Sequence, residues 1–358
     1  MKRVLFVCNS VYQVLVASWI KYHNFANDSA DIILSERMNG VYDIAARMKK
    51  TEIFNDVSVL KIKYSNNGKI NSVLKYVNFN SFAKKYTKKE KYDILYTASM
   101  DYFIATLFDL LKRKNKSLIL NYYEDGTASY TKRLSWYYEL FKKPSGLKNI
   151  SHNNLFKKYT IYSSFNEFCV FAPELLEWYP EGSKVCEIDK IDINDNGFKK
   201  FINYIFDYEN LEDKYEEKYI FFEESFYADT GYMEDVHLIE KLGRIVGKEN
   251  LLIKIHPRNP ENRFAKMGYK TNINTAIPWE IIAMNIDLTD KKIIAVASTS
   301  IINPIQVLGI DARAYSLINC LNEIPQLLNS PLSQTVINLF KAYPNNITLC
   351  SSIEEISK

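Results

Sequence analysis

Short apolar runs alternate along the chain with longer stretches in which apolar residues recur at helical spacing. In the first half, the apolar runs predict strands at 4–8, 31–34, 57–62, 92–96 and 118–122. Helical spacing predicts helices between them, at 12–22, 41–49, 70–86 and 102–111. Strands that alternate with helices form a parallel sheet with right-handed crossovers. The first half of the chain is therefore predicted to be one α/β layer structure.

The second half repeats this order of elements. Strands are predicted at 219–222, 251–255, 293–297 and 312–317, and helices at 234–246, 301–308, 323–328 and 334–343. An acidic, mixed stretch at 180–218 separates the halves, and we place a domain boundary within it, giving domains at 1–195 and 196–358. Two Rossmann-like α/β domains that face each other across a cleft make the arrangement called GT-B in glycosyltransferases. Other two-domain enzymes share this architecture, so the fold alone does not settle the function.

Charge and hydropathy exclude several classes of protein. The 358 residues include 46 basic and 42 acidic side chains, and the formal charge of +4 is too small to indicate a nucleic-acid partner. This charge suits a weak attraction to an anionic membrane surface. Asn9, Ser10 and Gln13 interrupt the first apolar run, so the amino terminus is predicted to be a strand and a helix rather than a signal peptide. No stretch has the length of a membrane span.

The cysteines are scattered without paired spacing. This pattern predicts neither a disulfide framework nor a zinc site, and it is typical of a protein in a reducing cytosol. The five positions are Cys8, Cys169, Cys186, Cys320 and Cys350.

Two acids and a glycine follow the strand predicted at 118–122. Gly126 allows a sharp turn, which places Glu124 and Asp125 at the carboxyl end of the strand. Ligands bind at this edge of open α/β sheets, so the pair is the best candidate for a catalytic base. Taken alone, these three residues more often form an acidic turn that caps the next helix.

A second motif, Lys254-Ile255-His256-Pro257-Arg258, ends a strand in the second half. Proline keeps the preceding histidine extended, and the flanking Lys254 and Arg258 favour an anionic ligand. An imidazole here can donate to a phosphate oxygen as a leaving group departs. An ordinary exposed turn explains the dipeptide about equally well.

Hydroxyl residues end another strand at Ser298-Thr299-Ser300. Hydroxyls at a helix start usually act as caps, although the same geometry can bind a phosphate. Glu280 follows Pro278 and Trp279 and could accept hydrogen bonds from a ribose diol. An ordinary first-turn acid of a helix is the more frequent interpretation of Glu280.

The order of these motifs resembles the bacterial sialyltransferases of the GT-B type. The resemblance is strongest to the lipooligosaccharide and capsular sialyltransferases, which are related to the bacterial polysialyltransferases. Members of that group open with a strand and an Asn/Thr-x-x-x-Gln turn, here Asn9 to Gln13. They also carry an acidic stretch that ends in tyrosine, here Glu124 to Tyr130. The similarity extends over most of the chain.

This resemblance implies transfer of sialic acid from CMP-Neu5Ac to a galactoside-type acceptor of a bacterial surface glycan. An acid of the Glu124-Asp125 pair would deprotonate the acceptor hydroxyl, and we favour Glu124. Acceptor contacts are expected from Asn9, Gln13 and the aromatic segment around Trp136. The donor roles fall on the second half, with His256, Ser298 and Thr299 at the phosphate, Pro257 fixing the loop and Glu280 at the ribose.

Two features leave alternatives within this assignment. The hydroxyl pair can be either Ser298-Thr299 or Thr299-Ser300, so Ser300 can be the phosphate partner. Asp229 also precedes a glycine beyond a strand, and it could supply the base or bind acceptor. The acids at 192–195 and 287–290 read as solvated loops, so we expect no metal and no other cofactor. The expected reaction is a single displacement with inversion through an oxocarbenium-like transition state.

Other functions stay open from the sequence. The donor could be another CMP-sugar such as CMP-Kdo, and the product could be a polymer of sialic acid. A non-catalytic protein of this fold that binds nucleotide or glycan is the alternative of another class. The expected partners are the CMP-sugar and an oligosaccharide acceptor. Lipid-linked acceptors would place the enzyme in the cytoplasm, at the inner face of the membrane. The acceptor, the linkage and a homodimeric state are left undecided.

Overall fold

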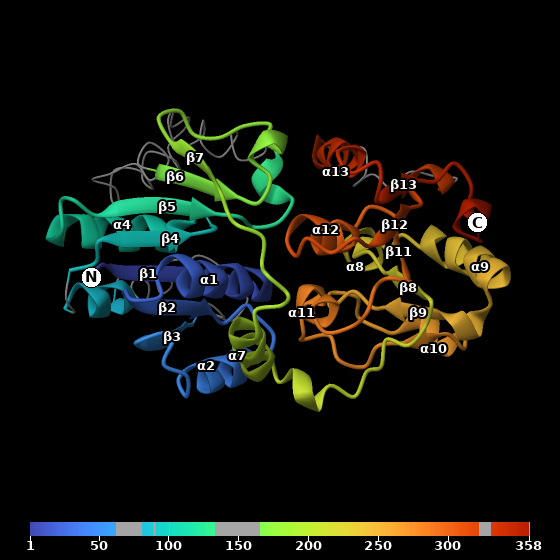
Figure 1. Ribbon diagram of the computed structural model, residues 1–358, viewed down its shortest axis with the longest axis horizontal. Helices are drawn as coiled ribbons and strands as arrows, with labels where there is room; N and C mark the ends of the chain where they lie inside the picture. Colours follow the sequence, from blue (N-terminus) through green and yellow to red (C-terminus); the bar gives the residue numbers. More distant parts are fainter. Residues whose placement is uncertain (62–80, 89–90, 100, 133–164, 322–330, 358) are drawn as a thin grey trace. The chain divides into compact units, whose positions relative to one another are not determined.

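The computed structural model describes residues 1–61, 81–88, 91–99, 101–132, 165–321 and 331–357 (Figure 1). The chain divides into two compact units, Met1–Asp189 and Lys190–Lys358. Each unit contains a parallel sheet with helices, so the prediction of two Rossmann-like α/β domains is confirmed. Trp136 lies outside the described residues.

The first unit has a seven-stranded parallel sheet in the order β3-β2-β1-β4-β5-β6-β7. The five predicted strands are confirmed as β1 to β5. The helices predicted at 12–22, 41–49 and 102–111 are confirmed, and residues 81–87 are helical, whereas 70–80 lie outside the described residues. The elements are β1 (Arg3–Cys8), α1 (Val11–Asn24), β2 (Ser29–Ser35), α2 (Val41–Met48), β3 (Asp56–Leu60), β4 (Ile94–Thr97), α4 (Tyr102–Lys114), β5 (Ile119–Tyr123), β6 (Phe165–Val170) and β7 (Lys184–Glu187).

The centre of this sheet is β1, which pairs with β2 on one side and β4 on the other. Its side chains from Val4 to Cys8 are at most 2% exposed, as expected for a strand covered on both faces. The chain proceeds outward from β1 in one direction through β2 and β3 and in the other from β4 onward. Ligands of open α/β sheets bind at such a reversal, beyond the carboxyl ends of the strands.

The expectation for the cysteines is wrong for one pair. Cys169 of β6 and Cys186 of β7 are register partners on neighbouring strands, and they form a disulfide. The sequence hides this pairing because the two residues are 17 positions apart and only the strand register places them opposite each other. Cys8, Cys320 and Cys350 are free.

The second unit has a six-stranded parallel sheet in the order β10-β9-β8-β11-β12-β13. The four strands predicted here are confirmed as β8, β9, β11 and β12, and the reversal lies between β8 and β11. The elements are α7 (Asn196–Phe206), β8 (Tyr219–Phe222), α8 (Phe226–Thr230), α9 (Glu234–Val246), β9 (Leu251–Lys254), α10 (Arg263–Lys266), β10 (Lys270–Thr271), α11 (Trp279–Ala283), β11 (Lys292–Ala295), α12 (Asn303–Gln306), β12 (Arg313–Ser316), α13 (Pro331–Lys341) and β13 (Ile347–Leu349).

The helices of this unit were predicted with mixed success. Those at 234–246 and 334–343 are confirmed as α9 and α13, and 323–328 lies outside the described residues. The single helix predicted at 301–308 is wrong. A 3-10 turn at Thr299–Ile301 precedes the short α12, which has Pro304 in its first turn. Proline is favoured at the start of a helix and disfavoured inside one, so the helical segment begins anew there.

No helix within the described ranges combines the length and the apolar character that a crossing of the bilayer requires.

We expect the substitution Phe168→Ala in β6 to destabilise the first unit strongly. The ring of Phe168 is fully buried and stacks on Tyr122, with 4.2 Å between centroids. Replacing such a ring leaves a cavity that costs about 3–5 kcal/mol of unfolding free energy. The midpoint of thermal unfolding, followed by circular dichroism, should fall by on the order of 10 °C. The control Tyr179→Ala, at a 46% exposed ring, should shift it little, and equal midpoints for the two variants would contradict this packing.

Candidate active site

Glu124 lies directly beyond β5, and its side chain is completely buried. The phenol of Tyr12 in α1 donates to Oε1 at 2.8 Å. Oε2 accepts from the phenol of Tyr130 and, at 2.9 Å, from the backbone N–H of Phe171 after β6. Both carboxylate oxygens are thus occupied by donors from three separate segments of the first unit.

Burial raises the pKa of Glu124 to about 7. The hydrogen bonds from Tyr130, Phe171 and Tyr12 oppose that rise, because they stabilise the ionised form. The carboxyl is therefore held near the point where it loses its proton at neutral pH.

Asp125 has a different environment from its neighbour. It lines a cavity of about 430 Å³ at the carboxyl edge of the sheet, together with residues that include Asn9, Gln13 and Arg37. Oδ1 accepts a hydrogen bond from Gln13 Nε2 at 2.6 Å. Burial raises the pKa of Asp125 to about 6, against the effect of that bond. Of the two acids, Asp125 is thus the one that a ligand in the cavity can reach.

The predicted acceptor residues Asn9 and Gln13 lie beside this acid. The backbone N–H of Asn9 donates to Gln13 Oε1 at 2.6 Å, so the Gln13 amide connects the end of β1 to Asp125. The Asn9 side chain donates to Ser99 Oγ at 2.7 Å, beyond β4. Gly126 has a φ of 59°, the left-handed region that favours glycine, and this conformation lets the chain turn after Asp125. The structure thus brings Asn9, Gln13, Asp125 and Gly126 together.

In the second unit, residues 255–259 form a turn after β9 that we call the His-Pro loop. The N–H of His256 donates to Glu223 Oε2 at 2.9 Å, and the N–H of Asn259 donates to His256 O at 3.0 Å. The Asn259 side chain also donates to the carbonyl of Glu224 at 2.9 Å. Hydrogen bonds to the end of β8 thereby hold both ends of the loop.

The His256 ring is neutral near physiological pH. Burial, with the nearby Arg258 and Lys254 charges, lowers its pKa to about 4. The Arg258 N–H donates to Nδ1 at 3.2 Å, which assigns the ring proton to Nε2. His256 therefore offers one N–H donor to a ligand.

Asp229, the alternative acid, is bound to the same loop. Its Oδ1 lies 3.1 Å from Arg258 Nη1, and its Oδ2 accepts from Ser225 Oγ at 2.6 Å. Arg258 also donates to Ser225 Oγ at 2.7 Å. The two oxygens of Asp229 thus contact Arg258 and Ser225, respectively.

Residues 297–300 follow β11 and form what we call the hydroxyl loop. Ser298 Oγ accepts from the Ser300 N–H at 3.3 Å and lies 3.1 Å from Ser300 Oγ. Ser298, Thr299 and Ser300 are all half-buried, so none is hidden from a ligand. Either Ser298-Thr299 or Thr299-Ser300 can therefore serve as the hydroxyl pair.

Lys254 and Glu280 are buried in the same unit. Burial lowers the pKa of Lys254 to about 8, and the charge of Glu280 opposes that fall. Burial also raises the pKa of Glu280, which accepts from Asn303 Nδ2 of α12 at 2.5 Å. Oε1 of Glu280 is thus occupied by Asn303.

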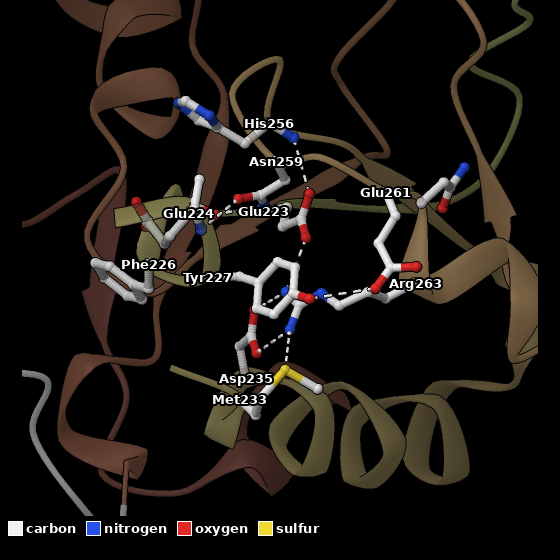
Figure 2. A network of polar contacts seen from close by, with 12 residues as sticks. Glu223, Glu224, Phe226, Tyr227, Met233, Asp235, His256, Asn259, Glu261 and Arg263 are labelled. Atoms are coloured by element: carbon white, nitrogen blue, oxygen red, sulfur yellow. Dashed lines mark hydrogen bonds and ion pairs between the residues drawn. The ribbon is translucent and has the colours of Figure 1, made fainter. Parts of the chain in front are cut away.

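The structure adds residues that the sequence analysis missed. Figure 2 shows Arg263 between Glu223 and Asp235, and the distances are 2.9 Å to Glu223 Oε1 and 2.7 Å to Asp235 Oδ2. Glu224 Oε1 accepts from the Ala297 N–H of the hydroxyl loop at 2.7 Å. The sequence does contain one indication of these residues, because a second acid pair, Glu223-Glu224, directly follows the strand predicted at 219–222.

Comparison with known proteins gives a family for this arrangement. The model of the Alpha-2,8-polysialyltransferase (POLYST) family matches residues 4–315. No curated protein has a significantly similar sequence.

Solved structures share the fold at low sequence identity. The α/β-galactoside α-2,3-sialyltransferase of Photobacterium phosphoreum is 13% identical, with 99% of each chain covered and a TM-score of 0.57. The UDP-GlcNAc 2-epimerase of Methanocaldococcus jannaschii is 13% identical, covering 99% of this chain and 98% of that one at a TM-score of 0.52. CalG4, the calicheamicin glycosyltransferase, is 10% identical, covering 99% and 88% at a TM-score of 0.52.

We expect Glu124 to make stability depend on pH. Its pKa is about 7 in the folded protein against an ordinary value of 4.5, so the folded state holds the proton more tightly between these values. The unfolding free energy should therefore fall as pH rises from about 4.5 to 7, by about 3 kcal/mol for this group. In urea titrations at pH 5 and 7.5, Glu124→Gln should show a smaller fall than the wild type. The exposed control Glu52→Gln should behave like the wild type, and an unchanged fall in Glu124→Gln would disprove the assignment.

Proposed function

The chain belongs to the alpha-2,8-polysialyltransferase family, and on that basis we propose that this sialyltransferase moves sialic acid from CMP-sialic acid to a galactoside-type acceptor of a bacterial surface glycan. The observation that carries the proposal is an acid with a pKa near neutrality, Asp125, which lines a cavity beyond a central strand. A general base works best when its pKa lies near the operating pH.

Within the acid pair, the geometry favours Asp125 as the base. Asp125 lines the cavity and has one hydrogen bond, to Gln13, through Oδ1. Glu124, which the sequence analysis favoured, has no exposed surface, and donors occupy both of its oxygens. Glu124 instead fixes the turn that carries Asp125.

We assign donor binding to the second unit. The Nε2–H of His256 and the hydroxyls of Ser298 to Ser300 donate to the phosphate of the CMP group, because these are the donors that the two loops offer. Lys254 adds positive charge nearby, and Pro257 shapes the His-Pro loop. Glu280 accepts from the ribose hydroxyls.

The reaction needs one base and no metal. The acceptor oxygen attacks the anomeric carbon of sialic acid while the bond from that carbon to the phosphate oxygen breaks, which inverts the configuration. The hydroxyl proton passes to Asp125, and the bonding electrons leave with CMP. The donor has a single phosphate, so hydrogen-bond donors and one lysine suffice to stabilise the departing charge. In the described parts of the chain, the one cluster with metal-ligand spacing is Glu167, Cys169 and Cys186, and its two sulfurs form the disulfide.

The family match also supports a polymer as the product, because the model describes α-2,8-polysialyltransferases. A lipid-linked acceptor would place the enzyme in the cytoplasm, at the inner face of the membrane, and we propose this location. The weak positive charge suits that position.

We expect Asp125→Asn to bind CMP normally and to lose transfer. Loss of a general base lowers kcat by about 10²- to 10⁴-fold. Glu124→Gln should lose less, because its carboxylate does not face the cavity, whereas His256→Ala should weaken both CMP binding and transfer. Calorimetric titration with CMP and initial rates of CMP release measure the two effects. If Glu124→Gln abolishes transfer and Asp125→Asn retains it, Glu124 is the base.

The donor is tested by offering CMP-Neu5Ac and CMP-Kdo side by side. We expect CMP release from CMP-Neu5Ac with a galactoside acceptor, and mass spectrometry of the product separates single from repeated addition. Release from CMP-Kdo alone would change the donor assignment. A thermal shift with CMP but no turnover on a panel of galactosides would favour a non-catalytic binding protein.

A further inference from the structure

Two consecutive acids at the end of β8 bind two different loops. β8 lies between β9 and β11 in the sheet, and each of these neighbours ends in a loop that we assign to the donor. The Glu223 side chain accepts from the His-Pro loop after β9, whereas the Glu224 side chain accepts from the hydroxyl loop after β11. The end of β8 is thus the shared support of both loops, and Figure 2 shows its contact with His256.

Glu223 is part of a buried ion pair. Its Oε2 accepts from the His256 N–H, and its Oε1 lies 2.9 Å from Arg263 Nη2. Arg263 also contacts Asp235 of α9 with two hydrogen bonds, of 2.7 and 3.2 Å. The three charged side chains are at most 6% exposed. The His-Pro loop is therefore attached to a rigid, buried cluster of two carboxylates and one guanidinium.

Glu224 is held by backbone N–H groups rather than by a cation. Its Oε1 accepts from the Ala297 N–H at 2.7 Å, and the Ser298 N–H is its second donor. In the described part of the chain, no cation pairs with this carboxyl. Burial raises the pKa of Glu224 to about 7, while the two backbone donors oppose the rise. The hydroxyl loop is thus held by an acid whose charge changes around neutral pH.

We propose that Glu223 and Glu224 are positioning residues that fix the spacing of the His-Pro loop and the hydroxyl loop, so that both present donors to one phosphate. This inference rests on the proposed function. The two acids differ in their effect on an anionic ligand. Glu223 is paired with a cation, Arg263, whereas ionised Glu224 has no cationic partner among the described residues and repels a phosphate bound at the hydroxyl loop.

The titration of Glu224 predicts how the affinity for the CMP-sugar changes with pH. Below pH 7, Glu224 is protonated, and its carbonyl oxygen can still accept from the loop amides. As pH rises through 7, the carboxylate forms, and affinity for an anion falls. The charged and titratable groups facing this region are Glu223 from β8, Asp235 from α9, Arg263 from α10, and Lys254 and His256 from β9 and its loop. His256 titrates near pH 4, well below the range from pH 6 to 7.5. Lys254 titrates near 8 and loses part of its charge by pH 7.5, so the comparison of the wild type with Glu224→Gln is what isolates Glu224.

A calorimetric titration with the methyl ester of CMP tests this prediction. The ester is a phosphodiester whose charge stays constant in this range, so any change in affinity belongs to the protein. We expect the wild-type Kd to rise roughly two- to fourfold from pH 6 to 7.5. Glu224→Gln, which keeps an amide oxygen as acceptor, should show a smaller rise in Kd than the wild type, because only Lys254 still loses charge in this range. Glu224→Ala, which cannot hold the loop, should bind up to about tenfold more weakly at both pH values.

Matched controls separate positioning from general effects. Glu261→Gln removes an exposed acid of the same unit, and it should keep the wild-type pH dependence. Thermal unfolding of each variant shows whether it is folded. A pH dependence that persists unchanged in Glu224→Gln would overturn the inference.

Hydrogen exchange of the ligand-free protein tests whether Glu223 and Glu224 hold the two loops when no CMP-sugar is bound. Glu224→Ala should speed exchange in peptides covering 297–300 and leave 255–259 unchanged, and Glu223→Ala should do the reverse. Unaltered exchange in both loops would refute the positioning role. Wild-type protein that binds neither the ester nor CMP-sialic acid would instead refute the proposed function, and the exchange data would still decide whether the acids hold the loops.

Discussion

A carboxylate beneath a protein surface is stable only where donors or cations meet it, and this constraint shapes the functional edge of each sheet. Glu124 in the first unit meets two phenols and one backbone amide, each from a different segment. Glu223 in the second unit meets a backbone amide and a guanidinium. In both units, the buried acid joins the segment beyond its own strand to the segment beyond a neighbouring strand, through Phe171 after β6 in the first and His256 after β9 in the second. The cost of burial is offset by these hydrogen bonds and, for Glu223, by the ion pair with Arg263.

The same constraint explains why acids come in consecutive pairs at these positions. Successive residues beyond a strand point in different directions, so a buried acid can be followed by one with another environment. Asp125 lines a cavity next to Glu124, and Glu224 holds the hydroxyl loop next to Glu223. The buried member gives rigidity, and its neighbour keeps a carboxyl that titrates near neutral pH.

Local patterns in the sequence were sufficient for the central elements. β1 and β9 are continuous apolar runs that are buried, and α9 has a clear helical period, so their type could be predicted residue by residue. β6 and β7 were missed because short strands of mixed polarity near a sheet edge have no distinctive period. The disulfide between them depends on register, which no local pattern encodes.

The candidate site could be predicted only in part for the same reason. Parallel strands gather their carboxyl ends at one edge, so the motifs could be placed at strand ends from the sequence. The choice between Glu124 and Asp125 could not be made, because the burial of Glu124 comes from Tyr12 and Phe171, which are distant in sequence. Arg263 was missed because nothing near it in the sequence shows that it pairs with Glu223.

The orientation of the His256 ring has a consequence for the balance of protons in each catalytic cycle. Nδ1 is committed to the Arg258 amide, and the low pKa keeps the ring from carrying a second proton. In the proposed reaction, CMP then leaves as an anion and takes no proton from His256. This suits a phosphate because it is a weak base. In the proposed reaction, the proton lost by the attacking sugar passes to Asp125 of the first unit and from there to bulk water. Turnover in an unbuffered solution would accordingly acidify it.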